Sequence, residues 1–184
     1  TSGDVETPQN FAPPEIYDPI SQKSCLFEET LCPDFPGADR RMGHTATAAP
    51  EGKVLVFGGV DEQGEFVEET LLYDFDTGSF RELTNYDPDQ VRPRTAHAAE
   101  WFRSDDASGG GYRDVILLAG GEASGLGGQV LTSNGLIFDV FAETFTQTNL
   151  SMVQARRDFS LTSFGPEKNL VLAVGGQGSS GLVS

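Results

Sequence analysis

Side chains that commonly carry chemistry are few in this sequence. The 184-residue chain contains two histidines, His44 and His97, and two cysteines, Cys25 and Cys32. Histidine can bind a metal ion or act as a general base. These two histidines end equivalent patterns, RMGH and RTAH, and a third pattern, RRDF, has Phe159 in the same position. Because a residue that repeats with the scaffold is expected to be structural, we predict no catalytic or metal-binding residues.

The two cysteines lie close together in the segment SCLFEETLC. Their spacing is too long for a CxxC motif, and no second pair completes a metal site. A disulfide between Cys25 and Cys32 is the favoured interpretation, and two buried free thiols are the alternative. A disulfide would indicate an oxidising compartment. We therefore expect a secreted, periplasmic or cell-surface protein.

Carboxylates gather in three segments, DEQGEFVEE at 61–69, DPD at 87–89 and SDD at 104–106. Clustered carboxylate oxygens can bind calcium in an extracellular setting. None of the segments matches a twelve-residue calcium loop. We expect solvated acidic loops and no cofactor, with calcium binding as the alternative.

The overall charge narrows the range of partners. Lysine and arginine number 12 against 28 acidic residues, which gives a formal net charge of −16. Such a chain repels a phosphate backbone, so nucleic acid is not an expected partner. No segment approaches the roughly 20 apolar residues of a membrane helix, so no membrane span is expected. The polar start TSGDVETPQN lacks the regions of a signal peptide and is expected to begin an extended arm at 1–14.

Three apolar runs, VLVFGG, VILLAGG and LVLAVGG, each end in a glycine pair. The runs do not alternate with polar residues, which is typical of strands covered on both faces. The glycines would allow another backbone to approach closely. The pairs are Gly58 and Gly59, Gly120 and Gly121, and Gly175 and Gly176.

An arginine precedes each of these runs, and the arginines Arg41, Arg94 and Arg156 stand about 50 to 60 residues apart. Each opens a segment such as HTATAA that reads as a further strand. One interpretation is that the arginine side chains donate hydrogen bonds to carbonyl or acidic groups near the axis around which the repeated units are arranged. The alternative is a ring of cations that binds an anionic ligand.

Two further similar segments, LLYDFDTGSF and LIFDVFAETF, follow the first two glycine pairs. In each, an aromatic residue followed by aspartate precedes a phenylalanine by seven residues. A turn would join two short strands and bring Tyr73 against Phe80, and Phe138 against Phe145. Each unit is therefore predicted to contain four strands.

The repeated elements resemble those of the kelch-repeat family. The glycine pairs are similar to the kelch double glycine, and Tyr73 and Phe138 to the aromatic residue that follows it. Phe80 and Phe145 stand where the family usually has tryptophan. The resemblance covers roughly residues 15–184 and implies an all-β fold, a β-propeller of four-stranded antiparallel blades that is incomplete in this chain.

The resemblance also suggests how the chain is divided. The segment EIYDPISQKSC is similar to the outer half of a blade, with Tyr17 and Asp18 matching Tyr73 and Asp74, although Ser24 replaces the second ring. The expected parts are the arm at 1–14, an outer half-blade with the cysteines at 15–33, a blade at 41–84, a blade at 92–148 with an insertion at 103–114, and an inner half-blade at 154–184.

The resemblance implies an array of blades and does not by itself imply a reaction. We expect a non-catalytic binding or assembly module, part of a secreted or envelope-associated propeller that engages partners through its loops. It would contact a protein partner or the rest of the same propeller, and a homo- or hetero-oligomer could complete the ring. A kelch-fold enzyme similar to galactose oxidase or to sialic acid isomerases is the alternative. That oxidase type needs a crosslinked tyrosine and cysteine beside histidine copper ligands, whereas both cysteines here lie near the N-terminus.

Two further features are expected on the surface of the protein. The glycine-rich insertion is the candidate contact loop, and the segment NLS places a possible glycosylation site at Asn149, in an expected connection between blades. The candidate contact residues are Asp105, Asp106, Gly109, Gly110, Gly111 and Tyr112.

We predict that Cys25 and Cys32 form a disulfide that replaces packing lost at Ser24. Peptide mapping without reductant should recover the two cysteines in one crosslinked peptide pair. Recovery of both thiols in free form would contradict the prediction.

Overall fold

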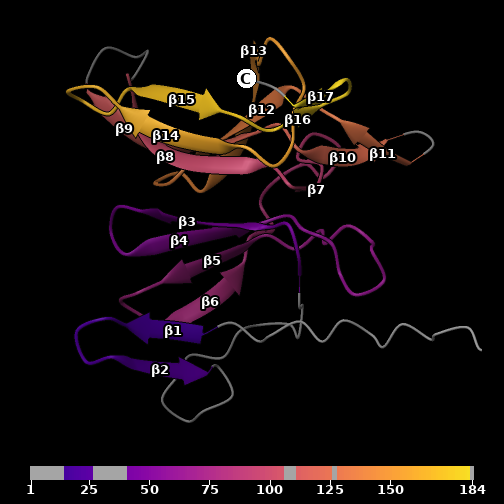
Figure 1. The fold of residues 1–184 in the computed structure, drawn as a ribbon. Coiled ribbons are helices and arrows are strands. Elements are labelled where there is room, and N and C mark those ends of the chain that lie inside the picture. Colours follow the sequence, from indigo (N-terminus) through magenta and orange to yellow (C-terminus); the bar gives the residue numbers. More distant parts are fainter. Residues whose placement is uncertain (1–14, 27–40, 106–110, 126–127, 183–184) are drawn as a thin grey trace, which may run out of the picture.

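The structure is a computed structural model that describes residues 15–26, 41–105, 111–125 and 128–182. Every regular element in these residues is a β-strand, and every strand pairing is antiparallel. The expected all-β class with antiparallel sheets is therefore confirmed. The described sheets do not join into a closed ring (Figure 1).

Two four-stranded sheets form the centre of the molecule (Figure 1). In both, each strand pairs with the strand that precedes it in its sheet. The first sheet contains β3 (Thr45–Ala49), β4 (Lys53–Phe57), β5 (Leu71–Asp74) and β6 (Ser79–Glu82). The second contains β8 (Ala98–Asp105), β9 (Tyr112–Ala119), β12 (Asn134–Asp139) and β13 (Thr144–Ser151).

Two-stranded hairpins lie toward either end of the chain. In one, β1 (Glu15–Asp18) pairs with β2 (Lys23–Leu26), and in the other, β14 (Ser160–Phe164) pairs with β15 (Leu170–Val174). Residues of β1 are all exposed to solvent. The hairpin of β14 and β15 instead packs on β8 of the second sheet.

The sequence did not predict several shorter strands, which follow a glycine pair or, in one case, begin at a repeated arginine. They are β7 (Arg94–Thr95), β10 (Glu122–Gly125), β11 (Gly128–Leu131), β16 (Gln177–Gly178) and β17 (Gly181–Leu182). In every unit the residue after the glycine pair bridges to the residue after the arginine. The three bridges are Met42 to Val60, Thr95 to Glu122, and Arg157 to Gln177.

The cross-strand aromatic contacts predicted from the sequence are confirmed. Tyr73 lies opposite Phe80 with ring centroids 4.8 Å apart, and Phe138 lies opposite Phe145 at 4.9 Å. In the β1–β2 hairpin, Tyr17 lies opposite Ser24 in the same register.

An aspartate shapes the turn that joins the two strands of each such hairpin. Asp74 Oδ1 accepts a hydrogen bond from the backbone N–H two residues later, at 2.9 Å. Asp18 and Asp139 accept the equivalent bonds, at 2.9 and 3.1 Å. The aspartate that follows each aromatic residue therefore has a local structural role, because its carboxylate mimics a backbone acceptor in the turn.

The apolar core lies between the two four-stranded sheets. Leu55 and Phe57 of β4 face Ile116, Leu118 and Phe138 of the second sheet, and all five are almost fully buried. Each such side chain stabilises the fold by about 1.5–3 kcal/mol when it leaves water. The apolar runs that precede the first two glycine pairs therefore hold the two sheets together.

Charged side chains link the same two sheets at their edge. Glu143, in the turn between β12 and β13, accepts hydrogen bonds from Arg81 of β6 and from Lys53 of β4. Burial raises the pKa of Glu143, but the hydrogen bonds and charges of Arg81 and Lys53 outweigh this effect, and the pKa lies below its usual value. The ion pairs therefore favour the docked arrangement at neutral pH.

The second sheet also binds the β14–β15 hairpin through polar groups. Glu100 of β8 accepts hydrogen bonds from the backbone N–H and the hydroxyl of Ser163, at 2.9 and 2.7 Å. The backbone N–H of Arg103 donates to the carbonyl of Lys168 at 3.0 Å, and the Lys168 ammonium lies 5.0 Å from the centroid of Trp101. Because β8 also contacts β3, the first long strands of successive units are neighbours.

The insertion expected at 103–114 is strand at both of its ends, and residues 106–110 lie outside the described residues. β8 continues to Asp105 and β9 begins at Tyr112, and these two residues pair with each other. Within the hairpin, Trp101 Nε1 donates to Asp114, which also forms an ion pair with Arg103. Side-chain contacts across the strands thus extend the ladder into a segment whose composition predicted a loop.

We predict that the hairpin tip is dispensable but its stem is not. Replacement of residues 106–111 by Asn-Gly should leave the melting temperature within about 3 °C, since closing a shorter loop costs little. Deletion of 103–114 removes the Arg103 to Lys168 hydrogen bond and should lower the melting temperature by roughly 5 °C or more. Equal effects in differential scanning calorimetry would contradict this division.

Candidate functional site

The repeated arginines meet the repeated glycines at one end of each sheet. Arg41 Nη1 donates to the carbonyls of Gly58 and Glu69, at 3.4 and 2.9 Å. Arg94 Nη1 donates to the equivalent carbonyls of Gly120 and Asn134, at 3.2 and 3.0 Å. The side chain therefore ties the end of the second strand of its sheet to the segment that leads into the third.

In the last unit, Arg156 Nη1 donates to the carbonyl of Gly175 at 3.0 Å. Backbone carbonyls thus accept hydrogen bonds from Nη1 of all three arginines. Of the two roles considered for these residues, this geometry corresponds to satisfaction of carbonyl groups.

The backbones of Arg94 and Arg156 each connect their unit to the preceding one. The N–H of Gly59 donates to the carbonyl of Arg94 at 2.9 Å, and the N–H of Gly121 donates to that of Arg156 at 2.8 Å. A methyl group at Gly58 would lie 2.2 Å from the Arg94 carbonyl oxygen. The glycines therefore allow the close approach of backbones that the sequence predicted.

A second backbone contact links the units two residues after each arginine. Gly43, Ala96 and Asp158 occupy this position, and all three have a left-handed backbone with φ of 72°, 53° and 54°. The N–H of Ala96 donates to the carbonyl of Gly43, and that of Asp158 to the carbonyl of Ala96, both at 2.9 Å. Two backbone hydrogen bonds therefore form at each junction between units.

His97 is packed inside the first junction. It is 6% exposed, and its Nε2 lies 2.8 Å from the hydroxyl of Thr45 in the preceding unit. Its ring meets Phe57 edge to face, with centroids 5.5 Å apart. Burial, together with the charges of Arg94 and His44, lowers the pKa of His97 to about 3. The neutral imidazole is therefore the form that the fold accommodates.

The equivalents of His97 in the other units have similar places. His44 Nδ1 lies 3.1 Å from the carbonyl of Arg41, and burial and the Arg41 charge lower the pKa of His44. Phe159 packs against Gly120 as His97 packs against Gly58. A ring is common to all three units whereas the imidazole is not, which favours packing over catalysis.

The other predicted surface residues are described only in part. Asp105, Gly111 and Tyr112 are exposed at the end of the β8–β9 hairpin, whereas Asp106, Gly109 and Gly110 lie outside the described residues. Cys25 lies in β2, and Cys32 and the arm at 1–14 lie outside the described residues. Asn149 lies within β13, not in the expected connection between units, because β13 continues to Ser151.

Within the described ranges, no group of three or more histidine, cysteine, aspartate or glutamate side chains is arranged to hold a metal ion. No helix in the same residues is long and apolar enough to cross a membrane.

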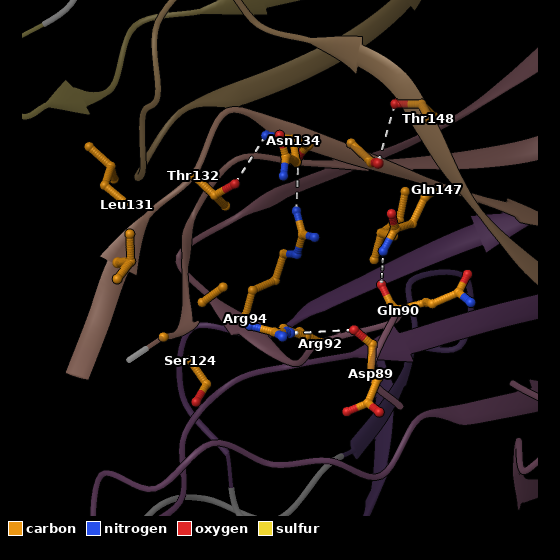
Figure 2. Close-up of a pocket in the computed structure, with 15 residues that line it drawn as sticks. Asp89, Gln90, Arg92, Arg94, Ser124, Leu131, Thr132, Asn134, Gln147 and Thr148 are labelled. Carbon is orange, nitrogen blue, oxygen red and sulfur yellow. Dashed lines mark hydrogen bonds between the residues drawn. The ribbon is translucent and has the colours of Figure 1, made fainter. Parts of the chain in front are cut away.

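A cavity of about 440 Å³ lies beside Arg94 (Figure 2). One side of the cavity is formed by the loop between β6 and β7. The other sides are formed by β10, by β11, by the start of β12 and by the part of β13 that pairs with it. Labelled residues around it are Asp89, Gln90, Arg92, Arg94, Ser124, Leu131, Thr132, Asn134, Gln147 and Thr148. This site was not predicted from the sequence. The glycines between EAS and QVL, which allow a hairpin, are the signal that could have indicated one of its walls.

We predict that His97 makes the stability of the fold depend on pH. Its pKa is about 3 in the folded protein, against 6.5 for a solvated imidazole. The stability that the neutral ring contributes to the fold is therefore fully present above pH 6.5 and is lost as the pH falls toward 3. His97→Phe, which copies Phe159, should cost about 1 kcal/mol at neutral pH through the lost Thr45 hydrogen bond. The cost should shrink or reverse in acid.

Denaturant unfolding at several pH values between 6.5 and 3 measures this effect. Carboxylates titrate in both proteins, so the difference between wild type and variant isolates His97. Parallel stability curves for the two proteins would show that protonation of His97 does not oppose folding.

Comparison with known proteins does not assign this chain. No protein-family model matches it, and no curated protein matches it.

Proposed function

We propose that this chain is a non-catalytic assembly and binding module, part of a kelch-type β-propeller in a secreted or envelope-associated setting. A further four-stranded unit would dock on the β14–β15 hairpin. The observation that carries this proposal is that the junction formed twice within the chain has a third copy whose inter-unit side is open.

The open junction is defined by backbone groups. The N–H of Gly59 and of Gly121 each donate to the arginine of the next unit, but the equivalent N–H of Gly176 has no backbone partner among the described residues. The same holds for the carbonyl of Asp158, whose equivalents at Gly43 and Ala96 both accept bonds. Exposed backbone groups of this kind are templates for pairing with further chain.

The glycine geometry agrees with this description. A methyl group at Gly120 would lie 2.6 Å from the Arg156 carbonyl oxygen, whereas a methyl group at Gly175 would have no atom within 4 Å. Gly175 nevertheless has the same left-handed backbone, with φ of 74° against 65° at Gly120. The last unit thus has the conformation that receives a neighbour.

The face of β15 that a neighbour would cover is apolar. Leu172 and Val174 are 52% and 54% exposed, whereas the residues in the equivalent positions of β4, Leu55 and Phe57, are 1% and 2% exposed. Leu170 and Phe164 on the same face are also about half exposed. Burial of these side chains would drive docking, since apolar area contributes roughly 25 cal/mol per Å² removed from water.

The occupant of this face is a unit of the same repeat, because the groups on offer are those that bind such a unit elsewhere in the chain. It can come from a longer polypeptide or from a second subunit, and the experiment below separates the two. The extended β8–β9 hairpin, with Tyr112 exposed, supports the part of the proposal in which loops contact partners.

Alanine variants at three glycines test whether the last junction is open. Gly175→Ala should destabilise the 184-residue polypeptide by about 1–2 kcal/mol, the cost of a left-handed alanine. Gly78→Ala is the matched control, since Gly78 also has positive φ and open space around it. Gly120→Ala should cost about 3 kcal/mol, because it adds a clash with the Arg156 carbonyl. A cost at Gly175 equal to that at Gly120 would show that the junction is already filled.

Hydrogen exchange and light scattering then identify the source of the neighbour. If a longer polypeptide supplies it, the 184-residue chain is monomeric, and Gly176 exchanges far faster than Gly121. If a second copy supplies it, protection of Gly176 rises with protein concentration as dimers form, and Gly175→Ala weakens the dimer. A monomer with Gly176 as protected as Gly121 would refute the proposal.

A further inference from the structure

The cavity beside Arg94 contains two guanidinium groups and an incomplete set of partners for them. Arg92 and Arg94 both line it. Arg92 Nε donates to the backbone carbonyl of Asp89, and Arg94 Nη1 donates to two backbone carbonyls. Neither arginine forms an ion pair with a described residue, although the chain carries 28 acidic residues against 12 basic ones.

Arg94 retains donors that the protein does not use. The side chain is 4% exposed, and its Nε is enclosed without a hydrogen-bond partner. Nη2 also lacks a partner among the described residues, but it is not enclosed, and Arg94 lines the cavity with its guanidinium group directed toward Asn134 (Figure 2). Burial lowers the pKa of Arg94 to about 10, so the group remains a cation at neutral pH.

This arrangement goes beyond the role that the repeated arginines share. Arg41 makes the same two carbonyl contacts, but both its Nε and its Nη2 are enclosed by protein. At Arg94, residues of β10 and β11 instead line a cavity beside the side chain. The cavity volume of about 440 Å³ is within the range of small-molecule sites.

The residues around the cavity define the ligand. Arg92, Arg94 and Asp89 together carry a net charge of about +1 at neutral pH, which suits a singly charged anion. A carboxylate matches the planar guanidinium donors. Neutral polar side chains, Ser124 and Gln147 among them, can bind hydroxyl groups on the body of the ligand.

We infer that this cavity is a binding site for a small hydroxyl-bearing carboxylate, held by Arg94 and Arg92. The inference does not depend on the proposed assembly, because every residue in it belongs to the described part of one chain.

Gluconate, a small carboxylate with several hydroxyl groups, is the probe. Titration of the ¹⁵N-labelled 184-residue polypeptide should give saturable shifts of the Arg94 Nε–H signal and of the amides of 123–125 and 130–136. Glucitol, which has the same carbon skeleton without the charge, should give no saturable shift at the same concentrations. Inorganic phosphate is the second control, since it offers an anion of different charge and shape.

Arg92→Gln tests the site without removing a repeated residue, because Arg92 is exposed and its hydrogen bond is to Asp89 in the same loop. We expect it to weaken gluconate binding about tenfold, the loss of one charge-assisted contact. Lys23→Gln is the matched control, as it changes the net charge equally in the distant β1–β2 hairpin, and binding should change less than twofold.

Saturable gluconate binding that Arg92→Gln weakens and Lys23→Gln does not would establish the site. Absence of saturable shifts at millimolar gluconate would overturn it. Equal binding of glucitol would show that the carboxylate is not recognised, and tighter binding of phosphate would show that the anion is of another class; either result rejects the inference.

Discussion

One backbone hydrogen bond recurs at each junction and, together with the second bond made two residues after the arginine, fixes how the described units stand relative to one another. Its donor is the N–H of the second glycine of a pair, and its acceptor is the carbonyl of the arginine that opens the next unit. The bond forms because the first glycine, Gly58 or Gly120, leaves room for that carbonyl. The apolar faces of β4 and of the second sheet meet as a consequence, and the core forms between them. Hydrophobic burial supplies most of the stability, and the junction sets its geometry.

Features that depend on neighbours in the sequence could be predicted from it. The runs before the first two glycine pairs became central strands, and the contacts of Tyr73 with Phe80 and of Phe138 with Phe145 followed from a seven-residue spacing across a turn. In these cases the repeat itself supplied the evidence, because a pattern that occurs twice at one spacing is seldom accidental. The close approach at the glycines was predicted for the same reason.

Features that depend on contacts between distant segments could not be predicted in this way. Whether 103–114 is strand or loop is decided by Trp101 and Asp114 across the hairpin, whereas composition alone indicated a loop. The cavity is formed by four segments, and no single one of them carries a recognisable motif. The extent of β13, which includes Asn149, depends on its pairing with β12.

The two junctions share their backbone bonds but differ in their side chains. Lys53 and Arg81 meet Glu143 at the first junction, and Glu100 meets Ser163 at the second. The shared backbone bonds do not distinguish one unit from another, whereas these side chains differ from one junction to the next. The covalent chain fixes the order of the units, and the side chains match each face to its own neighbour, so exchange of the charged residues between junctions would weaken docking without altering the fold of any one unit.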